Sequence, residues 1–146
     1  MIERVVVATD GSESVTRAIV TALDVADRFD ATVYALYVLD TDDVDAAPEE
    51  LKADVEDALE SQGRAALDAV EETAQREVNT VVRTGRPERE IVDFARETDA
   101  DLVALGTRGR HGEHRLLLGS VAEAVVRTCP VPVLSVRQLE RRPAGS

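Results

Sequence analysis

Three glycines and a serine are spaced through residues 106–120 in a pattern that suits the binding of an anion. Gly106-Thr107-Arg108-Gly109 comes first, and Gly119-Ser120 follows after nine further residues. Glycines at 106, 109 and 119 are expected to permit positive φ and a close approach of the main chain to a ligand. A helix that begins near Ser120 would add free N–H groups and the positive end of its dipole. The pattern therefore predicts a phosphate-binding loop.

The local charge agrees with this prediction. Residues 107–118 contain three arginines (Arg108, Arg110 and Arg115) against one glutamate, in a chain of formal net charge −12. Arg110 and Arg115 can equally be solvated surface residues. His111 and His114 add positive charge at lower pH, but they have no cysteine or further carboxylate at ligand spacing, which disfavours a metal site.

Ser120 also has an interpretation that needs no ligand. Ser120 and Glu123 match the S-x-x-E capping box, in which the serine hydroxyl accepts from a main-chain N–H of the first helical turn. Capping and phosphate contact can coexist at one helix end, so both roles are expected of Ser120.

The composition limits the class of protein. The chain of 146 residues fits one domain, and no apolar run is long enough to form a membrane-spanning helix. With 29 acidic against 17 basic residues, and Lys52 as the only lysine, the surface disfavours nucleic acid and anionic membranes and resembles that of salt-adapted proteins. The single Cys129, expected to be a small buried side chain, and the absence of a signal-peptide pattern predict a cytoplasmic protein.

The elements that must position the loop alternate regularly between strand and helix patterns. Short β-branched runs predict five strands, and amphipathic stretches between them predict four helices, with Gly63 weakening the longest one. The predicted strands are residues 2–8, 31–39, 78–82, 102–105 and 131–136, and the acidic segment 40–50 is expected to be a loop. Such alternation predicts a parallel sheet whose ligand lies outside the carboxyl ends of the strands. We expect one domain over residues 1–137 and a flexible tail over residues 138–146.

The sequence resembles a known family, the universal stress proteins of the ATP-binding type. The resemblance covers nearly the whole chain and includes residues 5–12, 85–87, 100–106, 119–122 and 130–134. It implies a five-stranded parallel sheet of order 3-2-1-4-5 that binds ATP with Mg²⁺ or Mn²⁺. It also implies a homodimer built through the last strand, Val131 to Val136, where Pro132 suits an edge.

The resemblance also assigns roles to individual positions. Those that match the ribose- and phosphate-holding residues are Gly106, Arg108, Gly109, Gly119, Ser120 and Val121. Asp10 matches a carboxylate near the ribose and base, Ala8 and Thr9 match its neighbours, and Val38 matches the residue whose main chain contacts adenine. Asp10 can instead be a helix N-cap, although Ser12 or Ser14 can also serve there.

The sequence is compatible with several functions. The first is a nucleotide-dependent switch or binding protein with at most slow ATP hydrolysis, because no general base is evident in the loop. The second is an enzyme of the wider group, such as a nucleotidyltransferase or ATP pyrophosphatase. Nucleotidyltransferases carry an H-x-G-H motif soon after the first strand, whereas residues 111–114 read His-Gly-Glu-His and follow the fourth strand. A phospho-receiver, which would need a lysine near Arg137, and a family member without nucleotide are further alternatives.

Overall fold

The computed structural model describes residues 1–107 and 119–137, and within them the strands form one parallel sheet. The sheet order is β3-β2-β1-β4-β5, with β1 at its centre. The strands are β1 (Arg4–Ala8), β2 (Thr32–Asp40), β3 (Val78–Gly85), β4 (Leu102–Gly106) and β5 (Val133–Val136). The predicted α/β fold and strand order are confirmed.

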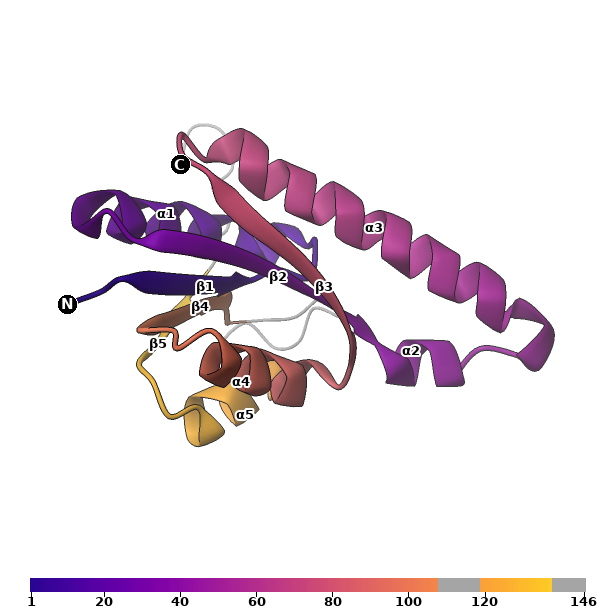
Figure 1. The fold of residues 1–146 in the computed structure, drawn as a ribbon. Coiled ribbons are helices and arrows are strands. Elements are labelled where there is room, and N and C mark those ends of the chain that lie inside the picture. Colours follow the sequence, from indigo (N-terminus) through magenta and orange to yellow (C-terminus); the bar gives the residue numbers. More distant parts are fainter. Residues whose placement is uncertain (108–118, 138–146) are drawn as a thin grey trace, which may run out of the picture.

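Helices cover both faces of this sheet (Figure 1). They are α1 (Thr16–Phe29), α2 (Thr41–Asp45), α3 (Lys52–Thr73), α4 (Pro87–Glu97) and α5 (Ser120–Thr128), with 3-10 turns η1 (Glu13–Val15) and η2 (Glu49–Leu51). Helices α1 and α3 pack on one face, and α4 and α5 pack on the other. No helix in the described part of the chain combines the length and apolarity needed to cross a membrane.

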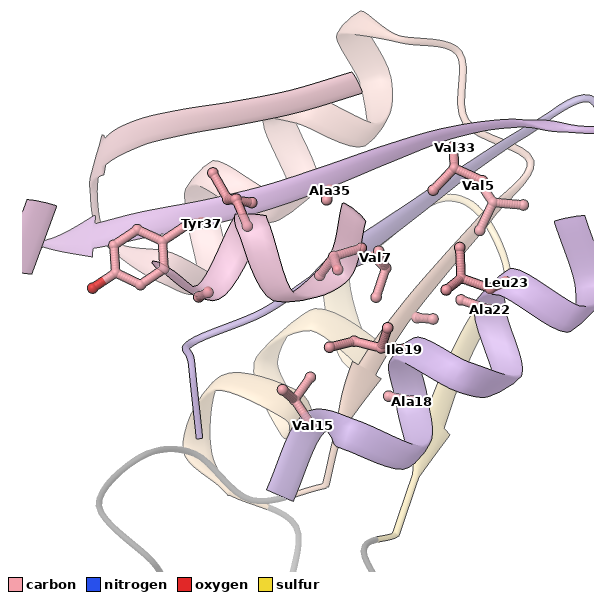
Figure 2. Close-up of a cluster of buried hydrophobic side chains, with 14 of the residues drawn as sticks. Val5, Val7, Val15, Ala18, Ile19, Ala22, Leu23, Val33, Ala35 and Tyr37 are labelled. Carbon is pink, nitrogen blue, oxygen red and sulfur yellow. The ribbon is translucent and has the colours of Figure 1, made fainter. Parts of the chain in front are cut away.

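Alternate residues of the central strands fill two separate cores. Val5 and Val7 point into the α1/α3 core together with Ile19 and Leu23 of α1, as Figure 2 shows. Val6 and Ala8 point into the α4/α5 core. Since both faces are covered, a continuous run of apolar residues is the pattern expected of β1.

Gly63 allows the long helix α3 to approach the sheet. A Cβ atom at this position would clash with a ring carbon of Tyr37, whose side chain is 1% exposed. Figure 2 shows the Tyr37 ring at the far end of the same core from Val5 and Val33. The expectation that Gly63 weakens the helix is therefore incomplete, because its missing side chain makes room for the largest fully buried residue.

The structure corrects several sequence predictions. The acidic segment 40–50 is not all loop: it contains α2 and η2. A side-chain oxygen of Asp40 accepts from the Asp42 main-chain N–H at 2.9 Å and caps α2, a short-range interaction that hydrophobic periodicity does not reveal. Strand β5 begins at Val133 rather than Val131, and Cys129 is half-buried against the α4/α5 core.

Candidate functional site

The turn that follows β1 is held by hydrogen bonds among its own side chains. Asp10 Oδ1 accepts from the Ser12 main-chain N–H at 2.9 Å and from Ser12 Oγ at 2.6 Å, and Ser12 Oγ lies 2.6 Å from Ser14 Oγ. Gly11 between them adopts φ +81°, which glycine accepts without strain. Asp10 therefore fixes this turn and is not the N-cap of α1, which begins at Thr16.

Val38 of β2 presents main-chain groups toward the turn that follows β1. The Thr9 main-chain N–H donates to the Leu36 carbonyl at 2.9 Å, so Leu36 directs its polar groups toward β1. Strand residues two apart point their N–H and C=O groups to the same side, so Val38 does the same. Strand β1 ends at Ala8, opposite Leu36, and Val38 thus offers one donor and one acceptor beyond the end of β1.

Gly106 brings the end of β4 against η1. A Cβ atom at Gly106 would lie 2.7 Å from the main-chain oxygen of Ser14, closer than real Cβ contacts allow. The expected positive φ is absent at Gly106 and Gly119: in the described part of the chain, the glycines with positive φ are Gly11 and Gly85. The reason for glycine at 106 is this close approach of two main-chain segments, not an unusual main-chain angle.

The start of α5 is tied to the end of β4 by a main-chain hydrogen bond from Gly119 N–H to the Thr107 carbonyl. Gly119 is the N-cap, with φ −64° and ψ 159°, and Ser120 is the first helical residue. The predicted capping box is therefore wrong. The Glu123 carboxylate pairs with Arg127 at 2.5 Å, and its main-chain N–H donates to the Gly119 carbonyl.

Among the described residues, no side chain caps the N-terminus of α5. A glycine N-cap supplies no side-chain acceptor for the N–H groups of the first turn. Ser120 is exposed and Val121 is half-buried at this end of the helix. The N–H groups of the first turn and the helix dipole together favour an anion here.

A cavity of about 380 Å³ lies beside Asp10. One wall is the turn after β1, formed by Asp10, Gly11 and Ser12, and the other wall is a face of α3. The residues of α3 that line it are Gln62, Ala65, Ala66 and Ala69. No motif in the sequence marks Gln62, and only the packing of α3 beside the turn brings it to the site.

Asp40, at the end of β2, is a further acidic group at this edge of the sheet. Burial raises the pKa of its carboxyl group, the Asp42 main-chain N–H opposes that rise, and the nearby Asp43, Asp42 and Glu88 carboxylates add to it. Within residues 1–107 and 119–137, no group of three His, Cys, Asp or Glu side chains is arranged to hold a metal ion.

The structure thus gathers most of the predicted residues at one edge. Ala8, Thr9 and Asp10 lie at the end of β1, Val38 on β2 beside it, and Gly106 at the end of β4 on the other side. Gly119, Ser120 and Val121 join them through the hydrogen bond to Thr107. The other predicted site residues, Arg108 and Gly109, lie outside the described residues, as do Arg110, Arg115, His111 and His114.

Comparison with known proteins gives a consistent result. Residues 1–137 match the model of the universal stress protein family. The chain is 38% identical over 140 residues to universal stress protein MJ0531 of Methanocaldococcus jannaschii, covering 93% of this chain and 82% of that protein.

Solved structures of the same family share the fold. The universal stress protein UspA from Lactobacillus plantarum has a TM-score of 0.78 and 28% identity, covering 93% of this chain and 98% of its own. A universal stress protein from Archaeoglobus fulgidus, solved in complex with dAMP, has a TM-score of 0.61 and 27% identity. The match covers 94% of this chain and 100% of that one. Sequence, strand order and these similarities together show that the chain belongs to the universal stress protein family.

Proposed function

We propose that this protein is an ATP-binding member of the family that acts as a nucleotide-dependent binding protein or switch. The observation that carries the proposal is the start of α5, where no side chain of the described residues caps the main-chain donors that lie directly beside the end of β4. The phosphates bind there, and the adenine lies against the main-chain donor and acceptor of Val38. The dAMP complex of the Archaeoglobus fulgidus relative supports a nucleotide as ligand.

The ribose lies between these two contacts, near Asp10. Asp10 is at the end of the central strand, with β2 on one side and β4 on the other, so a ligand that reaches from Val38 to Ser120 passes it. A divalent cation, Mg²⁺ or Mn²⁺, enters with the phosphates, as Mg²⁺ commonly does. Arg108 and Gly109 complete the phosphate contacts in this proposal.

Isothermal titration with ATP and Mg²⁺ tests the proposal. We expect saturable heat with a dissociation constant in the micromolar range or tighter, and weaker binding of adenosine, which lacks the phosphates. Titration in molar KCl that gives no heat, on protein shown to be folded, contradicts the proposal.

Hydrolysis is expected to be slow. A fast ATPase needs a group that orients the attacking water, and the proposed contacts supply main-chain donors and arginine but no such base. Phosphate release measured over hours is expected to remain far below the turnover of about 10 s⁻¹ that is typical of enzymes. A turnover near that value contradicts a binding role.

We propose further that β5 pairs with β5 of a second copy. Val103 N–H donates to the Pro132 carbonyl and Thr107 N–H to the Val136 carbonyl, so these alternate residues face β4. Ser135 is adjacent to Val136 and therefore directs its N–H the opposite way, to the edge of the sheet away from β4. Ser135→Pro removes that donor without touching a bond to β4, and light scattering is expected to show a monomer. Ser135→Ala is the control that remains dimeric.

The acidic surface is the basis for a proposal about the protein's environment. We propose a cytoplasm rich in salt, where counterions screen the repulsion among 29 acidic residues. Dilution from molar KCl to about 0.1 M is expected to lower the melting temperature. A melting temperature that does not change on dilution contradicts this proposal.

A further inference from the structure

Ser135 of β5 carries a buried hydroxyl group that has no hydrogen-bond partner in the described part of the chain. Of the buried side-chain nitrogen and oxygen atoms in residues 1–107 and 119–137, this oxygen is the one without a partner. A buried hydroxyl that has lost its hydrogen bonds to water lowers the stability of a fold. Folded proteins keep few such groups, and a functional site is one reason to keep one.

The side chain of Ser135 points to the α4/α5 face of the sheet. In the pairing of β4 with β5, Ser135 lies opposite Leu105, and residues paired in this way direct their side chains to the same face. Leu105 belongs to the α4/α5 core, as does Val133, two residues before Ser135. On this face, α5 is the helix that packs against β5. The hydroxyl is therefore covered by α5 and is not at the edge of the sheet away from β4.

Two main-chain hydrogen bonds connect the end of β5 to the start of α5. Thr107 N–H donates to the carbonyl of Val136, the residue after Ser135. The Thr107 carbonyl accepts from the N–H of Gly119, the N-cap of α5. Ala122, in the first turn of α5, packs in the α4/α5 core. Ser135 thus lies at the end of β5 that is next to the first turn of α5.

The surroundings of the hydroxyl indicate the kind of ligand. The neighbouring side chains on this face, those of Leu105 and Val133, are apolar and offer no hydrogen-bond acceptor. The first turn of α5 favours an anion, through its main-chain N–H groups and the helix dipole. A serine hydroxyl can donate to an anion, and hydrogen bonds to a charged oxygen are stronger than those between neutral groups. A phosphate oxygen therefore suits both the helix end and the hydroxyl.

We infer that Ser135 is a further phosphate-binding residue, whose hydroxyl donates to a phosphate oxygen of the nucleotide at the start of α5. The inference rests on the proposed ATP-binding function. The hydroxyl lowers stability while it has no acceptor, and ATP supplies one. Removal of the hydroxyl is therefore expected to change the stability of the ligand-free protein and its ATP affinity in opposite directions.

The first experiment measures stability without nucleotide. Ser135→Ala removes the hydroxyl with almost no change in side-chain volume. It is expected to raise the melting temperature of the ligand-free protein by about 2–4 °C. A clear fall in the melting temperature would show that the hydroxyl stabilises the ligand-free fold, and it contradicts the inference.

The second experiment measures ATP binding by isothermal titration with Mg²⁺. Ser135→Ala is expected to weaken ATP binding at least about tenfold, the scale of one hydrogen bond to a charged group. Ser135→Cys, measured under reducing conditions, fills the same space with only a weak donor and is expected to weaken binding similarly. Ser61→Ala, at an exposed position of α3, is the matched control that is expected to bind ATP as the unaltered protein does. Circular dichroism confirms that all variants are folded.

The outcomes separate this inference from the proposed function. If the unaltered protein binds ATP and both Ser135 variants bind it equally well, Ser135 is a packing residue only, and ATP binding stands. If Ser135→Cys retains the affinity that Ser135→Ala loses, the loss comes from packing and the inference is again wrong. If the unaltered protein binds no ATP, the proposed function fails, and this inference fails with it.

Discussion

The two ends of the sheet satisfy their main-chain groups in different ways. At the amino end, a side-chain oxygen of Asp101 accepts from the Glu3 N–H at 2.8 Å and from the Arg4 N–H at 3.0 Å. The Asp101 N–H in turn donates to the Arg4 carbonyl at 2.8 Å. The start of the central strand is thereby closed by the protein's own groups.

Helices α1 and α4 both end at the amino end of the sheet, and their last turns have the same main-chain geometry. Asp30 follows α1 and Asp99 follows α4, and both adopt φ 52°. The N–H of the next residue, Ala31 or Ala100, donates back to the helix at 2.9 Å, as in a Schellman motif. Arg76 adds a hydrogen bond to the Ala26 carbonyl at 3.0 Å at the end of α1.

The carboxyl end lacks comparable closure among its described residues. Val38 points its main-chain groups past the end of β1, and the first turn of α5 follows a glycine N-cap. A cavity separates the turn after β1 from α3. One end of the sheet therefore stabilises the fold, and the other has groups available for a ligand.

The largest effect is expected from Gly106→Ala, at the ligand end. The new Cβ would lie 2.7 Å from the Ser14 main-chain oxygen, so β4 and η1 must separate. Unfolding experiments are expected to show a loss of about 1–3 kcal/mol, the scale of overpacking. ATP titration is expected to show little or no binding, because this contact positions the turn relative to β4. A variant with unchanged stability and ATP affinity contradicts the role given to Gly106.

Ser120→Asp is expected to separate stability from binding. A carboxylate in the first turn of α5 interacts favourably with the helix dipole and adds about 0.3–1 kcal/mol to the free energy of unfolding. The same charge repels phosphate, so ATP affinity falls at least about tenfold. Ser120→Asn keeps the size without the charge and controls for loss of the hydroxyl. If Ser120→Asp binds ATP as the unaltered protein does, the phosphates do not bind at this helix end.

At the amino end, Asp99→Gly is expected to raise stability without changing ATP affinity. Glycine adopts φ 52° without the steric cost borne by aspartate, and the change removes a negative charge from a helix C-terminus. The expected gain is about 0.5–1 kcal/mol, measured by denaturant unfolding. Thr98→Gly, one residue earlier at φ −91°, is the control that is expected to lose stability.

Asp101→Asn tests the amino end of the sheet through the pH dependence of stability and is expected to give the smallest effect. Hydrogen bonds from the Glu3 and Arg4 N–H groups lower the pKa of the Asp101 carboxyl below its ordinary value of 3.8. A lowered pKa stabilises the folded state at pH above 3.8, and this stabilisation disappears as the pH falls through the folded-state pKa. The melting temperature of Asp101→Asn is expected to lie slightly below that of the unaltered protein near neutral pH and to converge with it in acid. A difference that grows toward acid contradicts this role.

The sequence predicted the fold, and it predicted that most of the candidate site residues lie together at one edge of the sheet. The alternation of β-branched runs with helices predicted the parallel sheet, and the family resemblance supplied the strand order. Asp10, Val38, Gly106 and Ser120 do lie at one edge of the sheet. The sequence predicted positive φ at Gly106 and Gly119, which is wrong, and it did not reveal the packing role of Gly63, since Gly63 and Tyr37 belong to elements far apart in sequence. Gln62 was missed for the same reason, because nothing in its neighbouring residues indicates the cavity it lines.

The most direct test of the difference between the two ends is a ¹H–¹⁵N NMR titration with ATP and Mg²⁺. We expect large shifts of the amide signals of Val38, Ser120 and Val121, with the signals of Glu3, Arg4 and Asp101 unchanged. Shifts confined to the amino-end amides, or an absence of shifts at Ser120 and Val121 at saturating ATP, would contradict this expectation.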